Sequence, residues 1–167
     1  MSKQLPLFAQ AEQPVTTHAF ELYIDGAARG NPGPAGIGLV ITTQGKPIEK
    51  AGFFIGTKTN NQAEYLALII AAIMLKKHAK MQDAVIIHSD SELLVKQMTG
   101  SYRVKDTTLQ QLFRTAYFLM QPYRVTFKHV MRTDNKHADA MANLGIDTHK
   151  ELPQRYKQVL NEYKINV

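Results

Sequence analysis

The order of apolar and polar residues predicts three strands at the start of the folded part of the chain. Apolar side chains alternate with polar or aromatic ones over residues 20–25, the period expected of a strand, and this strand ends on Asp25. A stretch rich in glycine and proline, residues 26–36, follows and predicts a tight turn. Two further strands are predicted over residues 37–42 and 48–55, joined by a short polar turn as in an antiparallel hairpin.

The longest apolar segment predicts the main helix, over residues 59–80. Its apolar residues cover nearly the whole circumference, so we expect the helix to be buried. Thr59, Asn60 and Asn61 are its candidate N-cap residues. Glu64 falls in the predicted first turn, either as a buried acid that needs a partner or a metal ion, or as a charge that favours the helix dipole.

The second half of the chain alternates short strands and helices. A short apolar run at residues 84–88 predicts a buried strand. The later elements are helices at residues 92–98 and 106–121, a strand at 124–130, and a last helix capped by Asp134 or Asn135 that stops at Gly145 or a little past it. This order is typical of an α/β fold, here a five-stranded mixed sheet with helices on both faces.

Length and composition indicate one domain with a tail at each end. We expect a flexible N-terminal tail over residues 1–18, the folded domain over residues 19–147, and a C-terminal tail or amphipathic helix over residues 148–167. Hydrophobic residues make up 44% of the chain, enough for a substantial core. No internal repeat and no second domain is indicated.

Charge and cysteine usage narrow the functional class. The net charge of +6 favours a polyanionic partner only weakly, because many basic proteins bind no nucleic acid. The chain has no cysteine, which excludes disulfides and thiolate metal sites. We see no signal peptide and no apolar run of membrane-spanning length, and we expect a cytoplasmic protein.

Four carboxylates have similar settings in the predicted fold. Asp25 and Asp90 each follow an apolar strand, whereas Glu64 and Asp139 lie early in helices. Side chains at strand ends of an open α/β sheet gather at one edge, and acids gathered there need cations. Oxygen ligands without cysteine select hard ions, Mg²⁺ or Mn²⁺, and two such ions can stabilise both the attacking and the leaving oxygen of a phosphodiester. The alternative is that each acid serves only its own turn or helix end.

The polar N-terminal tail contains three large apolar side chains. They belong to the segment Gln4-Leu5-Pro6-Leu7-Phe8. The segment resembles the pentapeptide by which bacterial replication proteins dock on the sliding clamp, an extended anchor whose side chains fill pockets. In that case Gln4, Leu5, Leu7 and Phe8 are the clamp-binding residues. Otherwise the segment is a short anchor that packs back onto the domain, or it has no role.

Four motifs together resemble one family. They are DGAARGNPGPAGIG, TNNQAEY, IHSDSELLV and NKHADAMAN, and in order and spacing they resemble the signatures of type 1 ribonuclease H across about residues 20–146. The resemblance implies the ribonuclease H-like fold, with Asp25, Glu64, Asp90 and Asp139 as the metal-binding catalytic acids. It also implies an endoribonuclease of DNA replication or repair. Such an enzyme hydrolyses the RNA strand of RNA–DNA hybrids with two Mg²⁺ ions, Mn²⁺ being possible, and leaves a 3′-hydroxyl and a 5′-phosphate.

The same motifs imply substrate-binding residues. Asn31, Asn60 and Asn61 would contact the nucleic acid, where their amides can hydrogen-bond to the 2′-hydroxyl that separates RNA from DNA. Thr59 matches a phosphate-contacting threonine of the family. Gly26 would let the RNA backbone approach closely. The alternative for the polar residues is ordinary turn and N-cap chemistry, and both roles can coexist.

The chain departs from many bacterial members of the family in the loop before the last helix. That loop, residues 130–135, has no glycine and no match to the family's catalytic-loop histidine. His129 and His137 flank it, and for both we favour a structural role. Arg132 is the candidate that would handle the leaving or product phosphate in place of a histidine.

A second departure is the absence of the helix that forms a basic protrusion in those members. Only residues 99–106 join the two helices here, with Arg103 and Lys105 as possible DNA contacts and Tyr102 as a possible stacking residue. The sequence thus resembles a compact subgroup of the family. The alternatives are a non-catalytic nucleic-acid-binding module and another phosphate-ester hydrolase on the same fold.

Overall fold

A computed structural model of the protein describes residues 19–167. The predicted N-terminal tail, with the clamp-binding-like segment at residues 4–8, lies outside the described residues. The elements in chain order are β1 (Ala19–Ala28), β2 (Gly33–Thr43), β3 (Lys46–Lys58), α1 (Asn60–Leu75), β4 (Ala84–Ser89), α2 (Glu92–Met98), α3 (Thr107–Met120), β5 (Arg124–His129), α4 (Lys136–Thr148) and α5 (Gln154–Glu162), with a 3₁₀ turn at Arg132–Asp134.

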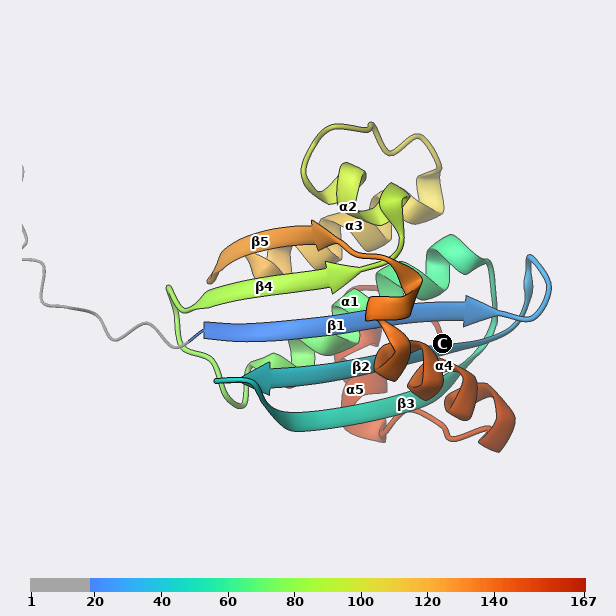
Figure 1. Ribbon diagram of the computed structural model, residues 1–167. Coiled ribbons are helices and arrows are strands. Elements are labelled where there is room, and N and C mark those ends of the chain that lie inside the picture. The colour runs from blue at the N-terminus through green and yellow to red at the C-terminus, as the bar shows by residue number, and fades with distance from the viewer. Residues whose placement is uncertain (1–18) are drawn as a thin grey trace, which may run out of the picture.

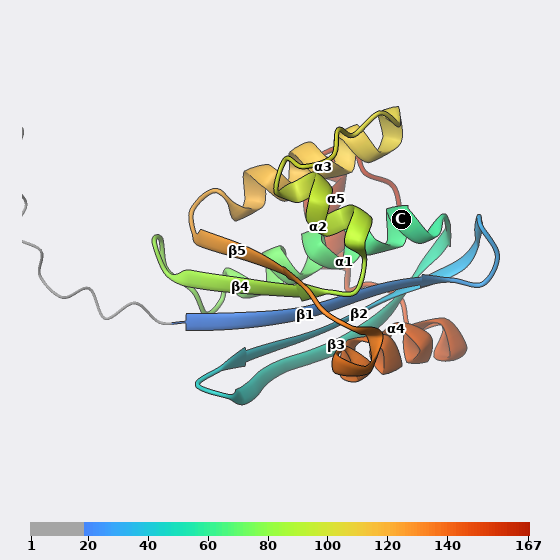
Figure 2. The same cartoon turned by 45° about the horizontal axis from the view of Figure 1, so that its top comes forward.

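The strands form one mixed sheet in the order β3-β2-β1-β4-β5. Strands β1, β2 and β3 pair antiparallel, whereas β4 pairs parallel with both β1 and β5. Helix α4 covers one face over β1, β2 and β3, and the other helices lie on the opposite side (Figures 1 and 2). The predicted α/β class, with a five-stranded mixed sheet and helices on both faces, is confirmed.

Helix α1 forms the centre of the core, since every residue from Ala63 to Leu75 is buried. The helix ends at Leu75, so its predicted extension to residue 80 was wrong. The reason is a change of environment: Lys76, Lys77 and His78 are exposed and continue in tighter turns, where Lys77 donates to the carbonyl three residues back. Described residues form no helix long and apolar enough to cross a membrane.

Strand β1 is longer than predicted. It continues past Asp25 to Ala28, because its pairing with β2 extends from Asp25 opposite Gly38 to Ala28 opposite Ala35. The tight turn is therefore limited to residues 29–32, and the glycines that follow belong to β2. Those glycines are needed for packing: a Cβ added at Gly38 would lie 1.9 Å from a backbone oxygen of α4.

The C-terminal segment contains a helix, α5, which packs on the core through Tyr156 and Leu160. Ile165, beyond the helix, is also buried. The segment is fastened at its other end by a hydrogen bond of 2.7 Å from the backbone of Phe54 in β3 to the carbonyl of Lys150. Helix α5 thus returns the chain toward the end of the sheet at which α1 begins, and the C-terminus lies near that end in both views (Figures 1 and 2).

Candidate active site

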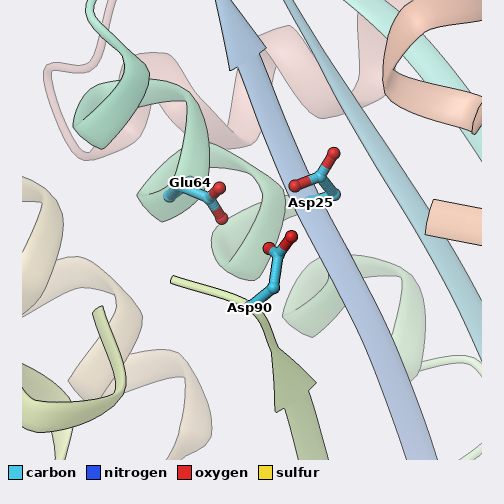
Figure 3. A group of neighbouring side chains, drawn as sticks. All are labelled: Asp25, Glu64 and Asp90. Atoms are coloured by element: carbon cyan, nitrogen blue, oxygen red, sulfur yellow. The ribbon is translucent and has the colours of Figure 1, made fainter. Parts of the chain in front are cut away.

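A cluster of acids lies where the parallel pairing of β1 with β4 ends. The pairing stops at Ile24 opposite Ser89, and the next residue of each chain segment is an aspartate, Asp25 and Asp90. Glu64 reaches the same point from α1, and the three side chains point toward one another (Figure 3). One carboxylate oxygen from each residue lies within 4.8 Å of the others. The structure therefore brings together three of the four acids that the sequence singled out.

Glu64 lies deeper in α1 than predicted. It is the fifth residue of the helix, whose first turn contains no acid, so the prediction of a first-turn position was wrong. The helix dipole weakens beyond the first turn and gives no reason for a carboxylate there. Glu64 is only 8% exposed, and its Oε2 atom has no hydrogen-bond partner among the described residues. A buried, unpartnered carboxylate oxygen of this kind is suited to a cation.

Burial and mutual repulsion disfavour the charged form of these acids. Burial is the main cause that raises the pKa of Asp25 to about 8, and the charges of Asp90 and Asp139 raise it further. Burial likewise raises the pKa of Glu64 well above its usual range, followed by the charges of Asp25 and Asp90. Divalent cations reverse this balance, and an all-carboxylate set of oxygens fits the hard ions Mg²⁺ and Mn²⁺.

Asp139 reaches the site from α4 but does not belong to the tight cluster. It lies in the first turn of α4, and its Oδ1 accepts a hydrogen bond of 3.2 Å from Nη2 of Arg132. Both side chains are accessible to solvent, Arg132 being 78% and Asp139 29% exposed. The predicted phosphate-handling arginine thus stands beside the fourth predicted acid, at the open side of the cluster.

Asn135 joins α4 to β1. The sequence suggested it only as an N-cap residue, yet its side chain makes no capping hydrogen bond. Its Nδ2 instead donates to the carbonyl of Ile24 at 2.8 Å, one residue before Asp25, and the residue is almost fully buried. The bond sets the start of α4, and with it Asp139, relative to Asp25. Nothing in the local pattern marks this long-range role.

The predicted substrate-binding asparagines connect the β1–β2 turn to the start of α1. The Oδ1 atom of Asn31 accepts from the backbone of Asn60 at 3.1 Å, and the Oδ1 atom of Asn60 accepts from the backbone of Ala28 at 2.9 Å. Asn61 is exposed. These hydrogen bonds are the turn and N-cap contacts that the sequence suggested. They use the side-chain oxygens of Asn31 and Asn60, so the amide N–H groups of both residues remain available as donors.

Thr59 and Gly26 also have structural roles at this place. Thr59 is the N-cap of α1 and forms a reciprocal capping box with Gln62. A Cβ added at Gly26 would lie 2.2 Å from the backbone carbon of Ala63. Glycine at this position lets α1 touch β1 directly, which brings Glu64 close to Asp25.

The two histidines beside the shortened loop do not enter the acidic cluster. The Nε2 atom of His129 lies 3.2 Å from the backbone oxygen of Asp90, and His137 is exposed in the first turn of α4. Between them, Arg132–Asp134 forms a single 3₁₀ turn.

Comparison with known proteins identifies the family. A family model described as "Reverse transcriptase-like" matches residues 23–145. The chain is 41% identical over 128 residues to "Ribonuclease HI" of Halobacterium salinarum, which covers 75% of the chain. It is 32% identical over 148 residues to "Ribonuclease H" of Albidiferax ferrireducens, covering 78% of this chain and 95% of that protein. The chain spans 63% of the length of the Halobacterium protein. It spans 34% of the length of the mycobacterial relatives that it also matches.

Solved structures agree with the sequence relatives. The crystal structure of Halobacterium salinarum RNase H1 matches with a TM-score of 0.74 and 38% identity, covering 78% of this chain and 98% of that one. The structure of LC11-RNase H1 in complex with an RNA/DNA hybrid matches with a TM-score of 0.70 and 41% identity, covering 77% and 97%. Because both its sequence and its fold match these proteins, the chain belongs to the type 1 ribonuclease H family.

Proposed function

We propose that this protein is an endoribonuclease that hydrolyses the RNA strand of RNA–DNA hybrids. The observation that carries the proposal is the cluster of Asp25, Glu64 and Asp90 at the end of parallel pairing, with one carboxylate oxygen of Glu64 buried and unpartnered. The similarity to LC11-RNase H1, whose structure contains an RNA/DNA hybrid, supports the substrate class.

Two Mg²⁺ ions are the proposed cofactors, with Mn²⁺ as a substitute. Asp25, Glu64 and Asp90 would hold them, and Asp139 would contribute from α4. When bound, the ions neutralise charge at the attacking and leaving oxygens of the scissile phosphodiester. The protein holds the carboxylates in place beforehand through β1, β4 and α1, so that little rearrangement is needed.

The proposed RNA contacts come from the residues that join β1–β2 to α1. Asn31 and Asn60 keep their amide N–H groups as donors, and Asn61 is exposed in the first turn of α1, so these three are the proposed donors to a 2′-hydroxyl. Thr59, at the N-terminus of α1, is the proposed contact to a backbone phosphate, because helix N-termini favour anions. Gly26, next to Asp25, is proposed to contact the RNA through its backbone, because the space that a side chain would occupy is filled by Ala63 and Glu64 of α1.

Arg132 is the proposed residue for the leaving or product phosphate. Its guanidinium has five donors, of which one is used in the pair with Asp139. Because the side chain is exposed and lies in a short turn, it can exchange this carboxylate for a phosphate without rearrangement of the fold.

Recruitment to replicating DNA is proposed for the N-terminal tail. The side chains of Gln4, Leu5, Leu7 and Phe8 have the pattern of a bacterial clamp-binding peptide, which binds as an extended anchor whose side chains fill pockets. Removal of residues 1–18 should leave hybrid cleavage unchanged and abolish binding to the sliding clamp, measured by titration of purified clamp. Binding retained by the truncated protein would exclude this peptide as the anchor.

Cleavage of a labelled RNA–DNA hybrid tests the main proposal. Single-stranded RNA, double-stranded RNA and double-stranded DNA serve as parallel substrates, each in Mg²⁺, Mn²⁺ or EDTA. We expect metal-dependent cutting of the hybrid's RNA strand alone, ending in 3′-hydroxyl and 5′-phosphate. Asp90→Asn should abolish cutting and leave hybrid binding intact or tighter, because it removes a charge that repels phosphate. Normal cutting by Asp90→Asn would overturn the metal assignment, and hybrid binding without any cutting by the unaltered protein would favour a non-catalytic module.

A further inference from the structure

An apolar groove runs beside β5, the last strand of the sheet. It lies between β5 and the C-terminal ends of α2 and α3 and has a volume of about 600 Å³. Its apolar lining comes from all three elements, with Met98 from α2, Tyr117 and Met120 from α3, and Phe127 from β5. Both helices lie beside β5 in both views (Figures 1 and 2). We call this feature the β5 groove.

The β5 groove is open to solvent. Tyr117 is 52% exposed, and Val125 and Phe127 are only half-buried. Within residues 19–167, β5 pairs with β4 alone, so its other edge has no strand beside it. Folded proteins usually cover such edges, and apolar surface next to one is typical of an interaction site.

The lining of the β5 groove has no charged residue. Three other cavities in the described part of the chain differ in this respect. Their linings contain Asp134 and His137, Lys58 and Lys164, and Arg103 and Arg114. The β5 groove therefore suits an occupant that is apolar and uncharged.

One segment of the same chain has this chemistry. Residues 4–8 contain the three large apolar side chains of Leu5, Leu7 and Phe8 and no charge. Apart from Met1 and Val15, the rest of residues 1–18 is polar, small or proline. An extended peptide of this kind binds by placing its side chains in pockets, and it can also lie along a free strand edge.

The chain is long enough for this segment to reach the β5 groove. Ala19 pairs with Ala84, which pairs in turn with Arg124 at the start of β5, so β1 and β5 begin about 10 Å apart. Phe127 lies three residues further along β5, which adds about 10 Å. Residues 9–18 can span up to about 35 Å when extended. The connection therefore covers the distance with length to spare.

An exposed methionine stands on this route. Met81 is 75% exposed and precedes Ala84 by three residues, at the end of the sheet where β1 begins. The backbone of its neighbour Gln82 donates to the carbonyl of Pro122 at 2.8 Å, and the next residue, Tyr123, lines the β5 groove. Apolar surface is thus present between the start of β1 and the groove.

We propose that the β5 groove binds the side chains of Leu5, Leu7 and Phe8 of the same molecule. These are also the side chains of the proposed clamp-binding peptide, so docking in the groove and binding to a sliding clamp exclude each other. The groove then lowers the affinity of the protein for the clamp, and the clamp displaces the segment when it binds. This inference goes beyond hybrid cleavage and does not depend on it.

A spin label on the first residues tests the docking in the full chain. Because the chain has no cysteine, Ser2→Cys provides a single site for a nitroxide. We expect the label to broaden the backbone amide signals of residues 98–99 and 117–127 in the NMR spectrum. Phe8→Ser should remove this broadening, whereas Val15→Ser, the matched change of an apolar residue outside the segment, should preserve it.

Three results would overturn the proposal. The first is a spectrum without broadening. The second is broadening at another cavity, for example at Tyr23 and Thr42 beside α4. The third is broadening that grows with protein concentration, because the segment would then occupy the groove of a second copy.

A change in the groove provides the reciprocal test. Tyr117→Lys places a charge in the lining, and Phe118→Lys makes the same change at a neighbouring exposed aromatic residue that does not line the groove. Tyr117→Lys should remove the broadening and tighten clamp binding about threefold, the factor expected where about two thirds of the molecules are docked. Phe118→Lys should alter neither. Broadening that persists in Tyr117→Lys would reject the groove as the site.

The two readouts separate this inference from the other proposals. If the purified clamp does not bind the unaltered protein, recruitment to the clamp fails, and the label alone decides whether the segment docks. If the clamp binds Tyr117→Lys and Phe118→Lys equally well, competition at the groove is excluded. Hybrid cleavage should be the same in both variants, since neither residue belongs to the acidic cluster.

Discussion

The side chain of Asn135 and the backbone of Ile24 form a buried hydrogen bond of 2.8 Å that joins α4 to β1. Asp25 follows Ile24 directly, and Asp139 follows Asn135 by four residues, one turn along α4. The same bond satisfies a carbonyl of β1 at the point where pairing with β4 ends. A single amide therefore sets the relative positions of two of the predicted catalytic acids.

Replacement of Asn135 should affect stability and activity together. Asn135→Ala leaves the carbonyl of Ile24 without its donor in a buried place, which costs about 1–3 kcal/mol. The start of α4 is then free to shift, so hybrid cleavage should fall even where the variant is folded. Denaturant unfolding and single-turnover cleavage at 15 °C measure the two effects. A loss of stability with normal cleavage would show that the bond does not position Asp139.

The exposed pair of Arg132 with Asp139 leads to a different expectation. Arg132→Gln should change the free energy of unfolding by less than about 1 kcal/mol, because exposed ion pairs contribute little. It also removes a cation beside the acids, so Mn²⁺ should bind about two- to fivefold more tightly, measured by calorimetry. If Arg132 handles phosphate, turnover falls at the same time. Arg114→Gln, at an exposed arginine of α3, is the matched control and should alter neither the free energy of unfolding nor the affinity for Mn²⁺.

The raised pKa of Asp25 makes stability depend on pH in the metal-free protein. Burial and the neighbouring acids raise the pKa of Asp25 to about 8, against about 4 in the unfolded chain. Between these values the folded state binds more protons than the unfolded state, so stability falls as pH rises from about 4 to about 8. Glu64, whose pKa is also raised, acts in the same direction.

Thermal unfolding in EDTA across this pH range tests the expectation. Asp25→Asn cannot titrate, so its midpoint should fall less steeply between pH 5 and pH 8 than that of the unaltered protein, by a few °C at the upper end. The stabilisation by Mg²⁺ should show the opposite trend and grow with pH, because metal ions bind the deprotonated acids. Parallel curves for the two proteins in EDTA would mean that Asp25 titrates normally.

The sequence predicted the parts of this fold that have a strong local signal. Alternating patterns and one short apolar run located the strands, and an apolar circumference identified α1 as the buried helix. The end of β1 was misjudged because glycine and proline usually break strands. Here β1 stays paired with β2 as far as Ala28, and α4 packs against Gly36 of β2. The end of α1 was misjudged because the helical pattern carries no mark for the place where the core stops.

The sequence predicted those residues of the site that lie at the end of a strand or near the start of a helix. Asp25 and Asp90 follow from strand ends, and Glu64 and Asp139 were noted from their positions early in helices. The four-motif resemblance assigned all four to one metal site, and the structure brings Asp25, Glu64 and Asp90 together. The role of Asn135 depends on a partner 111 residues away, and no local pattern encodes that. The docking of α5 was likewise not encoded locally, and the sequence left a helix or a loose tail open for residues 148–167.

Gly26→Ala is the sharpest test of how closely α1 must approach β1. The added methyl group would lie 2.2 Å from the backbone carbon of Ala63 and 2.3 Å from the backbone nitrogen of Glu64, so backbone atoms must shift. We expect a loss of stability of about 1–3 kcal/mol and a weaker metal site, since Glu64 moves away from Asp25. Gly56→Ala, which meets nothing within 4 Å but has a φ of 75°, is the control for backbone strain alone. Equal loss of Mn²⁺ affinity in both variants would mean that the approach of α1 to β1 is not what holds Glu64 in the cluster.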